Sequence, residues 1–217
     1  MGYTYCMADI HGESNRYFTM LEKICFKESD SLYIIGDVID RGPRSVEILQ
    51  DVMRRPNVKM LLGNHEQMCL DAFKSGSRAS QEFVLWRQNG GSQTYRQLAY
   101  GIDRAQRNRI LKFLATLPYT VDVDVKGRSF QLVHGFPAPT KYDSIWARPG
   151  ADACSPIPGV TIVGGHTPTI VLTENYNEQM HIWSHNGYIN IDCGCGKKTT
   201  LRRLACLRLD DMSEFYV

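Results

Sequence analysis

The stretch Gly36-Asp37-Val38-Ile39-Asp40-Arg41-Gly42 holds two carboxylates and one guanidinium between two glycines. It follows the run Ser-Leu-Tyr-Ile-Ile at 31–35, whose β-branched and aromatic residues predict a short buried strand. It precedes Pro43, a residue type favoured at the first position of a helix. Charged side chains at the end of a buried strand do not build a core, but they can hold a cation beside an anion. The order strand, turn and helix indicates an α/β fold with a site at this turn.

Two more turns of the same kind lie nearby. A predicted strand over 3–8 ends in Asp9-Ile10-His11-Gly12, and one over 58–62 ends in Gly63-Asn64-His65-Glu66, where Asn64 is a candidate helix N-cap. Side chains two residues apart on a strand point the same way, so Asp9 and His11 are candidate ligands of one ion. Taken alone, a capping Asp beside a surface His is the alternative. Because open α/β sheets bind ligands at the carboxyl ends of their strands, three such turns favour one shared site.

Hydrophobic periodicity and breaking residues divide the rest of the chain. Three helical segments are predicted, over 14–27, from Pro43 to the break at Pro56-Asn57, and over 68–117 with interruptions at Gly76 and Asn89-Gly90-Gly91. Leu85, in the last segment, is expected to pack in the core. A hairpin is predicted from 119–125 and 129–133. Further strands are expected at 160–163, 170–173, 180–183, 188–192 and 201–209.

Four of the six histidines adjoin glycine-containing turns at strand ends: His11, His65, His134 and His166. Packing alone does not explain this recurrence. His181 and His185 lack that context and are predicted to be strand-edge or surface residues.

Taken together, these turns supply carboxylate, amide and imidazole donors: Asp9, His11, Asp37, Asn64, His134 and His166. This mixed set suits manganese, iron or zinc better than calcium or magnesium, which favour oxygen ligands. The donors are too many for one tetrahedral ion. Two ions about 3.5 to 4 Å apart that share a carboxylate would use them and would activate a bridging water.

Arginine forks match phosphate oxygens, so Arg41 and Arg148, the latter in a proline-rich loop, are candidate phosphate ligands. The alternative for Arg41 is a structural ion pair with Asp40. His65 adjoins a candidate ligand without having to bind metal itself. We therefore expect His65 to protonate the leaving group as a general acid, with Asp40 orienting it.

Length and composition restrict the function further. A chain of 217 residues suggests a single catalytic domain over 1–217. A net charge of +2 without an aromatic-interleaved basic run does not favour nucleic acid as a partner. No apolar run approaches the roughly 20 residues that span a bilayer, so no membrane partner is expected. Seven scattered cysteines and the absence of a signal-peptide pattern predict a cytoplasmic protein.

The motifs at 9–12, 36–42, 63–66, 134–135 and 165–167 resemble, in this order, those of metallophosphoesterases. The likeness is to the PPP-type serine/threonine protein phosphatases in their compact bacterial and bacteriophage form. It extends to Asn89-Gly90-Gly91, Trp146-Ala147-Arg148 and Ile189-Asn190-Ile191-Asp192, and so covers most of the chain.

The resemblance implies a calcineurin-like four-layer αββα sandwich of the α/β (α+β) class with mixed sheets. It also implies two bound divalent metal ions, for which manganese is the leading candidate. Asp9 and His11 would serve the first ion, Asn64, His134 and His166 the second, and Asp37 would bridge. Arg41, Arg148 and Asn64 would contact the substrate phosphate.

The activity implied is hydrolysis of phosphoserine or phosphothreonine in a phosphoprotein or phosphopeptide. A hydroxide bound by both metals would attack phosphorus in line. Two alternatives stay open. Symmetric diadenosine tetraphosphate hydrolases are similar in their motifs, and a catalytically silent phosphate-binding module could keep the same fold.

Overall fold

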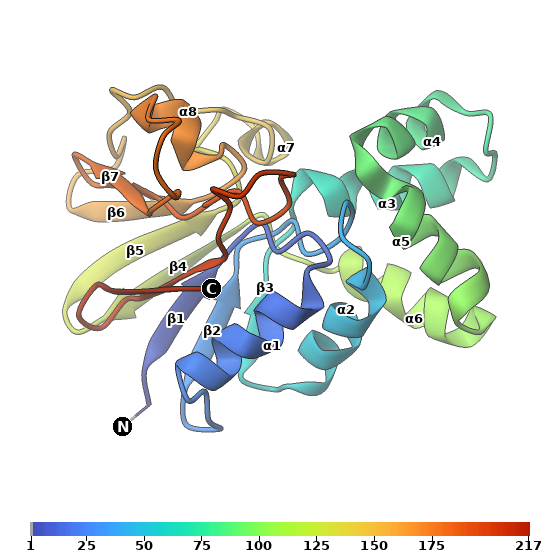
Figure 1. Cartoon of the computed structure of the whole chain (residues 1–217), viewed down its shortest axis with the longest axis horizontal. Coiled ribbons are helices and arrows are strands. Elements are labelled where there is room, and N and C mark those ends of the chain that lie inside the picture. Colours follow the sequence, from blue (N-terminus) through green and yellow to red (C-terminus); the bar gives the residue numbers. More distant parts are fainter. Residues whose placement is uncertain (1) are drawn as a thin grey trace.

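The computed structural model describes residues 2–217, which form two five-stranded sheets (Figure 1). The first sheet has the strand order β10-β9-β1-β2-β3, and the second has the order β4-β5-β6-β8-β7. The strands of the first sheet are β1 (Thr4–Met7), β2 (Ser31–Ile34), β3 (Val58–Met60), β9 (Ala205–Arg208) and β10 (Ser213–Tyr216). Those of the second are β4 (Thr120–Val125), β5 (Arg128–Val133), β6 (Val160–Gly164), β7 (Trp183–His185) and β8 (Tyr188–Asn190).

Both sheets are mixed, as expected. In the first, β1, β2 and β3 pair in parallel, while β9 pairs antiparallel with β1 and with β10. In the second, β5, β6 and β8 pair in parallel, while β4 and β7 pair antiparallel at the two edges. The parallel strands of each sheet therefore end at a common edge, and the turns that follow them can meet there.

The helices lie mainly on one side of the first sheet and beyond its β3 edge (Figure 1). They are α1 (Ser14–Lys23), α2 (Ser45–Arg54), α3 (Asn64–Ser75), α4 (Gln81–Trp86), α5 (Ser92–Arg96), α6 (Arg104–Leu114), α7 (Lys141–Ser144) and α8 (Thr169–Thr173). Two π-helical turns, η1 (Arg87–Gly91) and η2 (Gln97–Gly101), separate α4, α5 and α6. Within residues 2–217, none of the helices combines the length and apolar character needed to cross a membrane.

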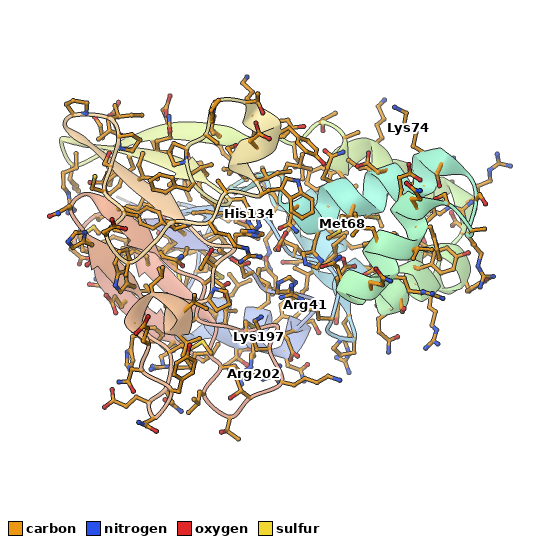
Figure 2. All side chains as sticks on the ribbon, turned by 90° about the horizontal axis from the view of Figure 1, so that it is seen from above. Arg41, Met68, Lys74, His134, Lys197 and Arg202 are labelled. Carbon is orange, nitrogen blue, oxygen red and sulfur yellow. The ribbon has the colours of Figure 1, made fainter. Side chains whose placement is uncertain are left out.

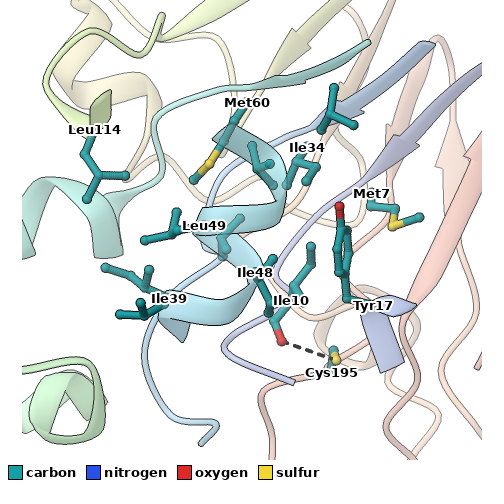
Figure 3. Packing of buried hydrophobic residues seen from close by; sticks show 14 of the residues in the cluster. Met7, Ile10, Tyr17, Ile34, Ile39, Ile48, Leu49, Met60, Leu114 and Cys195 are labelled. Atoms are coloured by element: carbon teal, nitrogen blue, oxygen red, sulfur yellow. Dashed lines mark hydrogen bonds between the residues drawn. The ribbon is translucent and has the colours of Figure 1, made fainter. Parts of the chain in front are cut away.

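The first sheet is buried on both faces, which explains its nearly continuous apolar strands. Met7, Ile34 and Met60 pack against Ile48 and Leu49 of α2 (Figure 3). The residues that alternate with them point to the other sheet. Cys6, Tyr33 and Ile35 belong to a core that includes Phe130, Leu132 and Val163 of the second sheet.

The outer face of the second sheet is covered by irregular chain and short helices. Val133, Ile162 and Tyr188 pack there against Phe136 and Ile157 of the loop that contains α7, and α8 lies above the same sheet (Figure 1). The expected αββα layering is confirmed, with a thin fourth layer.

Several element predictions were wrong. Residues 170–173, predicted as a strand, lie in α8, because a short apolar run has no distinctive period. Of the predicted strand at 180–183 only Trp183 belongs to β7, and only Ala205–Arg208 of 201–209 forms β9. β10 was not predicted. Leu85 is 48% exposed because it lies on the outer face of α4.

Two helix starts also differ from the prediction. α2 begins at Ser45 rather than Pro43. The N-cap of α3 is Gly63, and Asn64 is its first helical residue, so the Asn64 side chain is available for contacts elsewhere. His181 and His185 are exposed, as predicted.

Candidate metal centre

The turns after β1, β2, β3, β5 and β6 meet at the carboxyl edge of the two sheets. They bring together every candidate metal ligand predicted from the sequence: Asp9, His11, Asp37, Asn64, His134 and His166. All six are buried, and His166, the most accessible of them, is 7% exposed. In Figure 2, His134 and Arg41 lie between the sheets and the helical region.

The backbone at this edge is held in left-handed conformations, which residues other than glycine seldom adopt. Asp9, His11 and Asp37 have φ angles of 53°, 49° and 53°, and Asp40, Arg41 and His166 also have positive φ. Hydrogen bonds between turns maintain these conformations. The amide of His11 donates to the carbonyl of Asp37 at 2.9 Å, and the amide of Gly42 donates to the carbonyl of His11 at 2.9 Å. Such local strain clusters at functional sites.

Glu66 fixes the turn that carries Asp37. Its Oε2 accepts hydrogen bonds from the amides of Asp37 at 2.8 Å and Gly63 at 3.0 Å. Its Oε1 accepts from the amides of Val38 at 2.9 Å and Ile39 at 3.2 Å. A Cβ at residue 63 would collide with Asp37 Oδ1, so only glycine fits there. Glu66 was not predicted as a site residue, although its place three residues after a helix cap is a sequence signal for binding backbone amides.

Asp37 lies between two groups of donors. On one side its Oδ2 is 3.7 Å from Nε2 of His11, which is 3.9 Å from Asp9 Oδ1. On the other side its Oδ1 is 3.3 Å from Nε2 of His134, and Asn64 Oδ1 is 3.0 Å from the same nitrogen. Ligand atoms lie within 4.8 Å of one another in two clusters, one of Asp37 with His11 and His65, the other of Asp37 with His134 and His166.

The imidazoles present their Nε2 atoms to the centre. Nδ1 of His11 donates to the carbonyl of Ile39 at 3.0 Å, and Nδ1 of His134 donates to that of Ile35 at 2.8 Å. A metal-ligating histidine usually donates its other ring N–H to a carboxylate, a backbone carbonyl or water, so this pattern is typical of metal ligands. Nε2 of His166 is buried and has no hydrogen-bond partner within residues 2–217. These donors fit divalent metal ions.

Burial and neighbouring charges shift the pKa values of the candidate metal ligands in opposite directions. Burial opposes ionisation of Asp37 most strongly, yet His134 and His65 outweigh it and hold its pKa well below the usual range. Burial also lowers the pKa of His134, but Asp37 reverses this and raises the pKa to about 10. For His166, burial and then His134 lower the pKa to about 3.

Asp192, which was not predicted as a site residue, adds a further buried carboxylate. Burial, followed by the charge of Asp192, raises the pKa of Asp9 well above its usual value. Crowded carboxylates of this kind are stabilised by cations.

A network of hydrogen bonds around His65 lies beside the candidate metal ligands. His65 Nδ1 is 2.7 Å from Asp40 Oδ2, and the indole Nε1 of Trp86 donates to the same oxygen at 2.7 Å. Arg41 donates through Nη1 to Nε2 of His11 at 2.7 Å and through Nη2 to Nε2 of His65 at 3.0 Å. Within residues 2–217 Arg41 forms no ion pair with Asp40, so the structural alternative for this residue is not observed. Arg148 Nη1 donates to the carbonyl of His166 at 3.2 Å.

Two mixed sheets with histidine and carboxylate clusters at their shared edge define a metallophosphoesterase. Residues 3–188 match the family model described as calcineurin-like phosphoesterase, and the chain belongs to this family. The family implies bound divalent metal ions, in agreement with the clusters around Asp37.

The chain is similar to proteins with different named substrates. It is 49% identical over 84 residues, 38% of this chain and 30% of the relative, to the symmetrical bis(5'-nucleosyl)-tetraphosphatase of Buchnera aphidicola subsp. Baizongia pistaciae. It is 33% identical over 140 residues, 64% of this chain and 61% of the relative, to serine/threonine-protein phosphatase 1 of Salmonella typhimurium. The matched stretches therefore leave a large part of each relative uncovered.

A solved structure shows the same fold. The cold-active protein-tyrosine phosphatase of a psychrophilic Shewanella species has a TM-score of 0.63 and 16% identity, covering 100% of this chain and 80% of its own. At that identity the likeness concerns the fold alone.

Proposed function

We propose that this chain, as a single catalytic domain over 1–217, is a phosphoprotein phosphatase that hydrolyses phosphoserine and phosphothreonine. It would use two divalent metal ions, and manganese is the leading candidate. The observation that carries the proposal is the buried His65–Asp40 hydrogen bond of 2.7 Å beside Asp37. An alkoxide of serine or threonine is a poor leaving group that needs a proton, and a histidine oriented by a carboxylate can supply one. A nucleoside diphosphate leaves without that help.

The candidate ligands lie on two sides of Asp37, and the two ions would share its carboxylate. Asp9 and His11 would hold one ion, and Asn64, His134 and His166 the other. When bound, the ions supply an activated water and stabilise negative charge on the phosphoryl oxygens.

Arg41 has to move for His65 to act. In the structure its guanidinium donates to Nε2 of both His11 and His65. A proton on His65 Nε2 would displace that contact, and a substrate phosphate would attract the guanidinium instead. We infer that Arg41 turns onto the phosphate when substrate binds, with Arg148 and Asn64 as the other phosphate contacts.

The second candidate is a symmetrical dinucleoside tetraphosphate hydrolase. The stretch of 49% identity to a protein of that name favours it. The two functions differ in measurable selectivity. We expect kcat/KM for a phosphothreonine peptide to exceed that for diadenosine tetraphosphate in the manganese-loaded protein. A preference for the dinucleotide by orders of magnitude would overturn the proposal.

A further inference from the structure

A groove of about 950 Å³ opens beside the metal centre. It is bounded by the start of α1, by the turn that carries Arg41, by 88–90 and by the loop 196–202. Arg41 lines the groove and also contacts His11 and His65, so the groove continues from the place where a substrate phosphate would sit. Figure 2 shows Arg41, Lys197 and Arg202 next to one another in this region.

The groove concentrates positive charge in a chain that has a net charge of only +2. Its charged lining consists of one carboxylate, Glu13, and five cations: Arg16, Arg41, Lys197, Lys198 and Arg202. Glu13 pairs with Arg202 at 2.8 Å. Within residues 2–217, Arg41, Lys197 and Lys198 have no carboxylate within 4.0 Å, and the side chains of all three are exposed. The groove can therefore accept anionic groups.

The loop that carries the lysines is fixed to the metal centre. A Cβ at residue 196 would collide with the ring of His11, so only glycine allows this approach. The carbonyl of Cys195 accepts a hydrogen bond from Arg202 Nη1 at 3.0 Å, and the amide of Lys197 donates to the carbonyl of Gly194 at 2.8 Å. The backbone that carries the two lysines is thus held beside the metal centre.

We infer that this groove binds acidic side chains that flank the phosphorylated residue of a peptide. The inference rests on the proposed phosphatase function and names its substrate class. The lining contains amide and hydroxyl groups that can bond a peptide backbone, for example those of Asn89 and Thr199. None of the groove-lining residues within 2–217 is aromatic, so these residues offer no surface on which a nucleobase could stack. Carboxylates on a peptide therefore fit better than a dinucleotide.

The test compares phosphothreonine peptides that differ only in three flanking residues, all Glu or all Lys. We expect the acidic peptide to have a kcat/KM about tenfold higher, as expected when several exposed ion pairs act together. In K197E/K198E this ratio should fall to about one or below. The matched variant K74E/K112E has the same change in charge at exposed positions that do not line the groove, and it should keep the ratio.

The ratio of two substrates within one variant cancels any loss of folded protein. A second measurement needs no variant: in the unaltered protein the preference should weaken as salt rises from about 0.05 to about 0.5 M, because exposed charges are screened.

Equal turnover of both peptides by the unaltered protein would overturn the groove inference and leave the phosphatase function standing. An equal loss of preference in K74E/K112E would also overturn the groove inference. It would show that the preference depends on the overall charge of the protein and not on the groove. Hydrolysis of p-nitrophenyl phosphate without turnover of any phosphopeptide would overturn the phosphatase function itself. A selective loss of diadenosine tetraphosphate hydrolysis in K197E/K198E would assign the groove to polyphosphates.

Discussion

His65 and Asp40 are joined by a hydrogen bond of 2.7 Å between Nδ1 and Oδ2 in a fully buried setting. Asp40 is 0% exposed, and Trp86 donates to the same carboxylate oxygen. The imidazole is therefore held at Nδ1 by a carboxylate that Trp86 also fixes, and its Nε2 faces Asp37 and Arg41. This arrangement suits the proton transfer that we propose for His65.

Replacing His65 with Asn should lower kcat for a phosphothreonine peptide by about 100- to 10,000-fold, because the leaving alkoxide loses its proton donor. The loss for p-nitrophenyl phosphate should be smaller, since nitrophenolate leaves more readily. Steady-state kinetics with both substrates and elemental analysis of bound metal check this. Equal losses for both substrates, with normal metal content, would show that His65 is not the acid.

Trp86→Phe should lower kcat and leave KM nearly unchanged, because Asp40 loses one donor and holds His65 less firmly. The buried carboxylate also loses a hydrogen bond, which should reduce the free energy of unfolding by about 1 to 3 kcal/mol. Trp183→Phe, in the edge strand β7, is the control. An unchanged kcat in Trp86→Phe would refute a positioning role for this tryptophan.

The turns of the site could be predicted because each is local. Asp9, His11, Asp37, Asn64, His134 and His166 follow short strands, and strands that run in parallel bring their ends to one edge. The left-handed backbone at Asp9 and Asp37 could not be predicted, since it depends on hydrogen bonds to other turns.

Long-range contacts were missed for the same reason. Trp86 reaches Asp40 across 46 positions of sequence, and Glu66 binds the amide of Asp37 across 29. Nothing in either local pattern specifies these partners. The error at 170–173 has another cause: the four residues Ile-Val-Leu-Thr fit a strand or a helix equally, and tertiary packing selects α8.

Glu66→Ala should destabilise the protein by about 3 kcal/mol or more, because four buried amides lose their acceptor. Urea unfolding of the metal-free protein measures this. Glu82→Ala, at an exposed position in α4, is the matched control. A loss no greater than that of the control would contradict the role assigned to Glu66.

Metal binding should release at least one proton per chain near pH 8. In the metal-free protein the pKa of His134 is about 10, so Nε2 is still protonated there and must lose its proton to a metal. Affinity should therefore rise with pH up to about 10. Calorimetry in two buffers with different ionisation enthalpies gives the proton count, and a count of zero at pH 8 would contradict this account.

The same proton stabilises the metal-free fold. The folded pKa of about 10 lies above the ordinary value of 6.5. This contribution is therefore complete below about pH 6.5 and is lost as the pH rises through about 10. In the chelated protein, His134→Gln should remove this part of the pH dependence of Tm. A profile identical to that of the unaltered protein would show that His134 does not carry it.

Stripping the protein with a chelator tests whether two divalent ions at the shared edge of the sheets make this chain a phosphoesterase. Hydrolysis of p-nitrophenyl phosphate is then measured before and after manganese is added, while bound metal is counted by elemental analysis. We expect no turnover in the stripped protein and recovery with about two ions per chain. Turnover that survives stripping, or a protein that binds no metal, would contradict this expectation.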